Sequence, residues 1–225
     1  MDIIIALKPF SVLDVGTGFG KYGVLCREYL ELWDGREEYN FLKRIDGVEV
    51  FENYITPLHK FIYNNIYTEN IIDLVEKLDY SYDLVLLIDV LEHFTKEEGK
   101  WLLNTLLSKN KGILIGTPKN PSTQKDAFEN VFETHKSFWE KKDLASLGKY
   151  YFIPDNISHI VYTTKEEQLL KMLQRKLKAL KMFRQESLIG ILTFKKRNII
   201  KRLKKRLSSM PYIVKIYRKY KKFGM

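Results

Sequence analysis

The stretch from Val12 to Gly20 restricts the fold more than any other part of the chain, because it joins an apolar run to three glycines at alternate positions. Its apolar residues are typical of a parallel strand that is covered on both faces. Glycine allows a positive φ and lets a ligand approach where a Cβ atom would block it. A helical pattern resumes from Tyr22 to Leu32, so the glycines lie where a buried strand passes into a helix. The stretch therefore predicts a ligand-binding turn at the edge of an α/β sheet.

Two classes of ligand suit such a turn. The segment from Gly18 to Gly23 matches the dinucleotide pattern GxGxxG, in which backbone amides hold a pyrophosphate. Asp14, however, lies two residues before Gly16 and extends the pattern to D-x-G-x-G-x-G. A carboxylate at that position repels a pyrophosphate and favours a cation. A glycine-rich turn that binds no ligand is the remaining alternative.

The whole stretch resembles motif I of the class I S-adenosylmethionine-dependent methyltransferases. The cofactor of that family carries a sulfonium, an ammonium and a carboxylate but no phosphate. The resemblance implies that Gly16, Gly18 and Gly20 bind S-adenosylmethionine, and that Asp14 supports the glycine loop and the amino acid end of the cofactor. It also implies the fold of the family, a three-layer, Rossmann-like α/β sandwich with a seven-stranded, mostly parallel sheet.

Two further acidic residues follow predicted strands. Glu49 closes a strand expected over residues 45–50, where a carboxylate accepts both ribose hydroxyls of a nucleoside. A solvated strand end is the alternative for this residue. If Glu49 binds the ribose, Val50 or Phe51 would face one side of the adenine. Residues 66–72 are strand-like and end in Asp73, which the resemblance maps onto the adenine amino group, although Asp73 could equally cap a short helix over residues 74–78.

An uninterrupted apolar run over residues 84–88 breaks at Asp89. It predicts a central parallel strand that delivers a carboxylate to the edge of the sheet where α/β proteins bind ligands. The sequence D-x-L-E-H from Asp89 to His93 resembles motif IV of the small-molecule branch of the same family. The resemblance places Asp89 near the methionine end of the cofactor, and Glu92 and His93 on the floor of the substrate pocket. For His93, a hydrogen-bonded structural role is the alternative.

The remaining strands of the sheet are expected at residues 111–118, 150–153 and 158–163, with the last two antiparallel. Residues 119–132 are polar and long enough to form a loop over the active site. Residues 130–139 resemble the segment after the fifth strand in related methyltransferases, where a histidine often faces the substrate. His135 is therefore the preferred candidate for a general base, with a loop-fixing role as the alternative.

Charge divides the chain into two parts, expected to be a cofactor-binding domain over residues 1–164 and a basic, mainly helical extension over residues 165–225. The extension carries 20 Lys or Arg and 3 Glu, a net charge of +17, whereas the remainder carries 18 basic and 25 acidic residues, a net charge of −7. Such a split predicts a polyanionic partner for the extension. Residues 195–225 mix lysines with tyrosines and apolar residues, which suits an anionic membrane surface or, as a second choice, nucleic acid. A solvated helical face that packs partly on its own domain is the third reading.

The cysteine content and the hydropathy of the chain predict the location of the protein in the cell. Cys26 is the single cysteine, and neither C-x-x-C nor clustered Cys and His spacing predicts a metal site. The apolar runs are too short to cross a bilayer, and the first residues do not have the pattern of a signal peptide. The expected location is cytoplasmic, with peripheral attachment to the membrane.

The favoured function is methyl transfer from S-adenosylmethionine to an oxygen or nitrogen atom of a small-molecule, saccharide or lipid-linked acceptor, with His135 or His93 as base. The N/D/S-P-P-Y/F motif of base-amino methyltransferases is absent, since Asp89-Val90-Leu91-Glu92 occupies its position. An RNA-directed methyltransferase that uses the basic extension to hold nucleic acid is one alternative. A non-catalytic module that keeps the cofactor fold is another. The sequence leaves the oligomeric state open.

Overall fold

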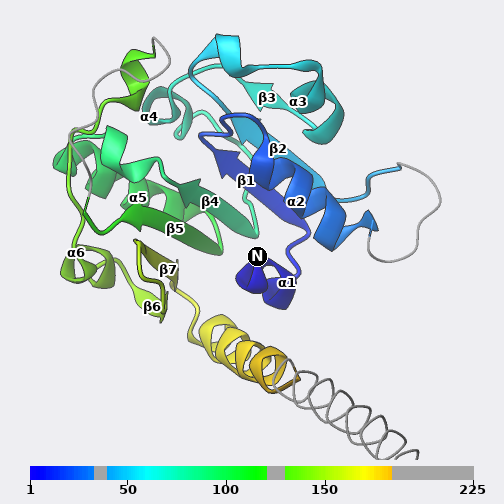
Figure 1. The fold of residues 1–225 in the computed structure, drawn as a ribbon, viewed down its shortest axis with the longest axis vertical. Coiled ribbons are helices and arrows are strands. Elements are labelled where there is room, and N and C mark those ends of the chain that lie inside the picture. The colour runs from blue at the N-terminus through cyan, green and yellow to red at the C-terminus, as the bar shows by residue number, and fades with distance from the viewer. Residues whose placement is uncertain (33–39, 121–129, 184–225) are drawn as a thin grey trace, which may run out of the picture. The chain divides into compact units, whose positions relative to one another are not determined.

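A seven-stranded sheet forms the centre of the computed structural model, which describes residues 1–32, 40–120 and 130–183. The strand order is β3-β2-β1-β4-β5-β7-β6, and Figure 1 shows the strands side by side. The strands are β1 (Ser11–Val15), β2 (Arg44–Val48), β3 (Ile66–Tyr67), β4 (Leu84–Ile88), β5 (Gly112–Pro118), β6 (Lys149–Ile153) and β7 (Ser158–Thr164). The predicted α/β fold with a seven-stranded sheet is confirmed.

The directions of the strands indicate at which edge of the sheet a ligand would bind. The strands β3, β2, β1, β4 and β5 pair in parallel. The strand β7 runs antiparallel to β5, and β6 pairs antiparallel with β7. The strand order reverses between β1 and β4, so the carboxyl ends of these two neighbours flank the point where open α/β sheets bind ligands.

Helices cover both faces of the sheet, which gives the three predicted layers. They are α1 (Asp2–Leu7), α2 (Lys21–Leu30), α3 (Pro57–Ile62), α4 (Ile71–Leu74), α5 (Lys96–Lys109) and α6 (Lys141–Ala145), with short 3-10 turns η2 (Glu52–Tyr54), η3 (Leu91–His93) and η4 (Val131–Glu133). Figure 1 shows α2 lying across β1 and β2. The opposite face carries the main core, in which Leu13, Val85 and Ile113 from the strands join Leu102 and Leu106 from α5. Alternation of side chains along each strand separates the two layers.

Two segments differ from the sequence prediction. The apolar residues between 53 and 63 have the spacing of one helix, which predicts a single helix there. The structure divides this segment into η2 and α3, because Pro57 begins α3 and Thr56 caps it with a capping box. The strand expected over residues 66–72 ends at Tyr67. Asn70 caps α4 by accepting a hydrogen bond from the amide of Ile72, so the apolar residues after it turn into a helix.

The carboxyl-terminal part begins with a helix at residues 167–183, where the described chain ends. The compact unit comprises Met1–Leu177 and therefore runs beyond the boundary predicted after residue 164. Within it, Leu173 is fully buried and the Lys176 ammonium donates to the carbonyl oxygen of Ala6. Residues 195–225, predicted to meet an anionic surface, lie outside the described residues. In the described ranges, no helix has the length and apolarity needed to cross a bilayer.

Candidate active site

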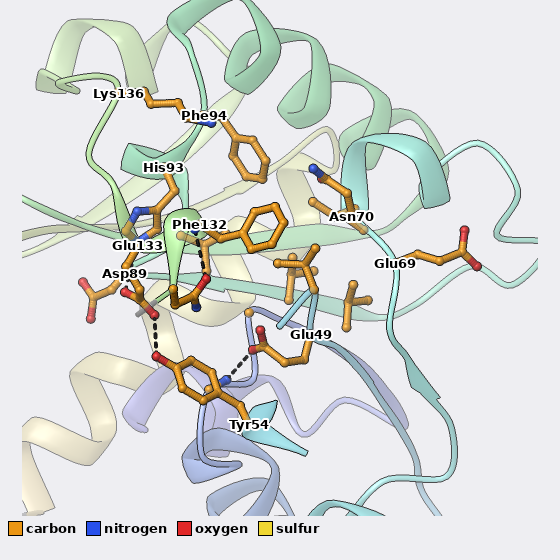
Figure 2. Close-up of a pocket in the computed structure, with 18 of the residues that line it drawn as sticks. Glu49, Tyr54, Glu69, Asn70, Asp89, His93, Phe94, Phe132, Glu133 and Lys136 are labelled. Atoms are coloured by element: carbon orange, nitrogen blue, oxygen red, sulfur yellow. Dashed lines mark hydrogen bonds and ion pairs between the residues drawn. The ribbon is translucent and has the colours of Figure 1, made fainter. Parts of the chain in front are cut away.

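A cavity of about 240 Å³ opens where β1, β2 and β4 end. Its lining includes Gly16, Gly18, Glu49, Val50, Asp89 and His93, all of which were predicted from the sequence as site residues. Figure 2 shows side chains from these strand ends and from the segment around η4 meeting round the cavity. The structure therefore brings together most of the predicted residues at the switch point of the sheet.

The glycine loop takes a conformation that requires glycine. Gly16, Gly18 and Gly20 have φ values of 70°, 51° and 84°, which are in the left-handed region. A Cβ atom on Gly16 would lie 2.4 Å from Cγ2 of Val90, whereas a Cβ on Gly18 would meet nothing within 4 Å. The loop is therefore packed tightly at its first glycine against Val90, which follows β4, and leaves open space at its second glycine.

His59 supports the loop from α3, although the sequence did not single it out. Its Nε2 lies 2.9 Å from the carbonyl oxygen of Gly18, and its Nδ1 lies 3.2 Å from the amide nitrogen of Thr56. A carbonyl only accepts and an amide N–H only donates, so Nε2 carries the hydrogen and Nδ1 accepts. The ring also packs under Gly20, which faces His59 rather than the cavity.

Asp14 lies under the loop and does not line the cavity. It is 2% exposed and accepts a hydrogen bond of 2.6 Å from the Tyr63 hydroxyl. Burial raises the pKa of Asp14 to about 7, the nearby Glu49 carboxylate adds to the rise, and the Tyr63 hydrogen bond opposes it. Gly23 leaves room for Tyr63, since a Cβ there would lie 2.4 Å from the phenol ring. Asp14 is therefore a buried carboxyl group that Tyr63 holds in place, and its support of the glycine loop stays a prediction.

Glu49 joins the second strand to the glycine loop. Its Oε2 accepts the Gly18 amide at 2.8 Å, and its Oε1 accepts the Phe51 amide at 2.9 Å. Both bonds hold the carboxylate in one orientation at the cavity wall (Figure 2). Burial raises the pKa of Glu49, and the two amide hydrogen bonds oppose that rise. Each carboxylate oxygen keeps a second lone pair with which it can accept a ligand hydroxyl.

The prediction that Asp73 contacts a bound adenine is wrong in this structure. Asp73 lies inside α4, is exposed and does not line the cavity. Its alternative role as a helix cap is also wrong, because Asn70 caps α4. Asn70 and Ile71 line the cavity instead, since the chain turns into α4 before it reaches residue 73.

Asp89 follows β4 with a φ of 56°, an uncommon value for a residue with a side chain. Its amide donates to the carbonyl oxygen of Gly116 at 2.9 Å, which keeps the backbone on the edge of β5. Burial raises the pKa of Asp89, whereas the Lys21 ammonium and the nearby His93 and His135 side chains oppose the rise. The left-handed backbone directs this carboxylate to the cavity that it lines.

The two predicted bases lie against each other, but only His93 lines the cavity. The ring centroids of His93 and His135 are 5.2 Å apart. Burial lowers the pKa of His93, so its imidazole is neutral at pH 7 and can accept a proton. His135 follows η4 and is half-buried behind His93.

Residues after β2 and around η4 complete the wall. The Tyr54 hydroxyl lies 3.2 Å from Oε1 of Glu133, and Figure 2 shows this contact across the cavity. Phe132 also lines the cavity, and its amide donates to Asn130. The predicted loop over the site is described only in part, because residues 121–129 lie outside the described ranges. Tyr54 and Glu133 carried no sequence signal beyond their polar side chains.

The charge of the cavity lining distinguishes between the two ligand classes. Among the described residues that line it, five are acidic and one, Lys136, is a lysine; the acidic residues are Glu49, Glu69, Asp89, Glu98 and Glu133. A negative wall opposes a pyrophosphate and favours a ligand that carries positive charge. The lining therefore agrees with the cationic ligand that Asp14 indicated in the sequence.

Comparison with known proteins supports the fold. No family model matches the sequence, and no curated protein matches it. Among solved structures, an O-methyltransferase family protein from Burkholderia thailandensis matches with a TM-score of 0.53 and 12% identity, over 72% of this chain and 52% of that chain. The chain thus shares the fold of that methyltransferase, as the resemblance in the sequence implied, and spans about half of its length.

Two further solved structures are similar at lower scores. The bifunctional kinase-methyltransferase WbdD matches with a TM-score of 0.48 and 14% identity, over 69% of this chain and 34% of that chain. The N-terminal domain of EvdMO1 with SAH bound matches with a TM-score of 0.49 and 16% identity, over 70% of this chain and 75% of that chain.

Proposed function

We propose that the protein transfers the methyl group of S-adenosylmethionine to an oxygen or nitrogen atom of a small-molecule, saccharide or lipid-linked acceptor. The observation that carries this proposal is the acidic cavity lined by the glycine loop and Glu49, in which the loop glycines have positive φ values. A nicotinamide dinucleotide would bring two phosphates to five carboxylates and one lysine. A ligand with a sulfonium and an ammonium brings positive charge to the same wall, which makes it the better match.

The residues around the cavity fit this cofactor. The open space at Gly18 admits a ligand close to the backbone, and Glu49 would accept hydrogen bonds from the ribose hydroxyls. Val50 and Ile71 offer apolar surface for the adenine, and the Asn70 amide would pair with its polar edge. The carboxylate of Asp89 would face the positively charged amino acid end.

The transfer needs little covalent chemistry from the protein. When bound, S-adenosylmethionine supplies a methyl group on a sulfonium that is already a good leaving group. The cavity wall then aligns the acceptor and excludes water, which accounts for a large part of the acceleration of such a step. For a hydroxyl acceptor, the neutral imidazole of His93 is placed to accept the proton that the acceptor loses.

A saccharide or lipid-linked acceptor is the preferred class. The D-x-L-E-H sequence at residues 89–93 resembles that of glycan and cell-envelope methyltransferases. The basic residues 195–225 would hold such an enzyme at an anionic membrane surface from the cytoplasmic side. An RNA acceptor is the second candidate, because the same basic residues suit a phosphate backbone.

A turnover assay tests this proposal. The full chain is incubated with S-adenosylmethionine and, separately, with saccharides, lipid-linked saccharides or RNA, and the release of S-adenosylhomocysteine is measured. Transfer to a saccharide or lipid-linked pool, lost in Glu49→Gln and retained in the exposed control Glu52→Gln, is the expected result. Transfer to RNA alone would favour the nucleic-acid alternative. Cofactor binding without turnover on every pool would favour a non-catalytic module.

A further inference from the structure

Three potential metal ligands meet beside the cavity. One oxygen of Glu92 and one ring nitrogen each of His93 and His135 lie within 4.8 Å of one another. Glu92 and His93 belong to η3, directly after β4, whereas His135 lies 42 residues further along the chain. The spacing in the sequence predicted no metal site, so this cluster is a product of the fold.

Hydrogen bonds hold the two segments together on both sides of His135, through the backbone on one side and through the His93 side chain on the other. The amides of Lys136 and Ser137 donate to the carbonyl oxygen of Glu92 at 2.8 and 3.1 Å. On the other side, Nδ1 of His93 lies 3.3 Å from the carbonyl oxygen of Thr134. Because main-chain bonds fix the approach, the three side chains meet without depending on the rotation of one exposed residue.

Hydrogen bonds with neighbouring groups fix the orientation of the His93 and Glu92 side chains, as is common for metal ligands in proteins. A carbonyl only accepts, so Nδ1 of His93 carries the hydrogen in the contact with Thr134 and the neutral ring keeps its lone pair on Nε2. Imidazoles that ligate metals commonly donate their other N–H to a backbone carbonyl or a carboxylate. Glu92 is 2% exposed, and its Oε2 accepts from the Thr117 hydroxyl at 3.2 Å. Hydrogen bonds with Thr117 and Thr134 thus hold the Glu92 carboxylate and the His93 imidazole in place.

We propose that Glu92, His93 and His135 bind a divalent transition-metal ion at the cavity wall. Two imidazoles and one carboxylate favour Zn²⁺, Mn²⁺, Fe²⁺ or Co²⁺ over Mg²⁺ and Ca²⁺, which prefer oxygen ligands. Metal–ligand bonds of about 2.0–2.2 Å place ligand atoms roughly 3–4 Å apart, so the side chains would close by about 1 Å on binding. Three protein ligands leave a further coordination position, and His93 borders the cavity into which that position would open.

The metal would bind the acceptor, a role that rests on the proposed methyl transfer. A hydroxyl oxygen bound to a divalent ion loses its proton more readily than a free hydroxyl. In that case His93 and His135 act as ligands in place of the proton-accepting role given to His93 above, and the proton of the bound hydroxyl passes to a carboxylate of the cavity lining, such as Glu133. The acceptor is then a hydroxyl in preference to an amine. Metal binding itself does not depend on the identity of the cofactor.

Titration of the metal-free full chain with Co²⁺ and Zn²⁺ tests the site. We expect one equivalent of Co²⁺ to bind with a visible absorption band, and Zn²⁺ to displace it. The variants His135→Ala and Glu92→Gln should each weaken metal binding at least about 100-fold, because each removes a ligand. The control is His159→Ala, which changes a histidine of β7 outside the cluster and should leave metal binding unchanged.

The outcomes separate this inference from the proposed function. No saturable Co²⁺ or Zn²⁺ binding, or equal binding by the wild type and both ligand variants, would overturn the metal site. Binding of S-adenosylmethionine is measured on the same samples, so a variant that keeps cofactor binding and loses metal binding is folded and supports the site. A wild type that binds the metal but not the cofactor would retain the metal site and refute the proposed function.

Discussion

Replacement of Gly16 and Gly18 by alanine tests how the glycine loop is built. Both residues have a positive φ, 70° and 51°, so each substitution places a side chain in the left-handed region. They differ in their surroundings. A Cβ on residue 16 would lie 2.4 Å from Cγ2 of Val90, whereas a Cβ on residue 18 would meet nothing within 4 Å. The pair therefore separates backbone strain from a steric clash within one loop.

The expected magnitudes follow from these two terms. A left-handed L-residue costs about 1–2 kcal/mol, offset by roughly 0.4–1 kcal/mol because alanine restricts the unfolded chain. Gly18→Ala should therefore lower the free energy of unfolding by about 1 kcal/mol. Gly16→Ala adds overpacking against Val90, a buried and β-branched residue that cannot easily rotate away, which costs a further ~1–3 kcal/mol.

Urea unfolding followed by tryptophan fluorescence measures both variants at pH 7. The double variant Gly16→Ala, Val90→Ala is the control, because removal of Cγ2 relieves the clash and should give a favourable coupling of at least about 1 kcal/mol. Equal destabilisation by the two single variants, or no coupling with Val90, would refute the reasoning.

Three other predictions concern the stability of the fold at Asp14, Gly99 and Leu173. The folded pKa of Asp14, about 7, exceeds its usual 3.8, so the protonated form stabilises the fold and that stability is lost as pH rises from about 4 to 7. Asp14→Asn should flatten this decline in urea unfolding, and parallel pH profiles would contradict it. Gly99→Ala places a Cβ 2.4 Å from Trp139 and should cost about 1–3 kcal/mol in thermal unfolding, unlike exposed Lys100→Ala. Leu173→Ala removes a fully buried side chain and should cost about 2–5 kcal/mol by urea unfolding, whereas a cost under 1 kcal/mol would show that this helix does not pack on the domain.

Strand-end residues of the site could be predicted from the sequence because their signal is local. The apolar run before Asp89 and the glycines after Val15 mark strands that end at one edge of a sheet, and the structure brings Gly16, Gly18 and Asp89 together there. The end of β3 was misjudged for a physical reason. Ile71 and Ile72 favour a strand by their branching, but the cap supplied by Asn70 turns them into α4.

The supports of the site could not be predicted in the same way. His59 and Tyr63 fit the spacing of an ordinary helix, and only the packing of α3 under the loop shows that they hold Gly18 and Asp14. The meeting of His93 with His135 depends on how the chain returns after β5. Contacts across such distances depend on tertiary packing that the spacing of residues does not encode.

The central claim is that the acidic cavity binds S-adenosylmethionine. Calorimetric titration of the full chain with S-adenosylmethionine and, separately, with NADH tests it most directly, alongside the double variant Asp14→Ala, Glu49→Ala. We predict saturable, micromolar binding of S-adenosylmethionine that the double variant loses, and no comparable binding of NADH. Failure of the wild type to bind S-adenosylmethionine, or a preference for NADH, would contradict the account and return the glycine loop to the dinucleotide interpretation.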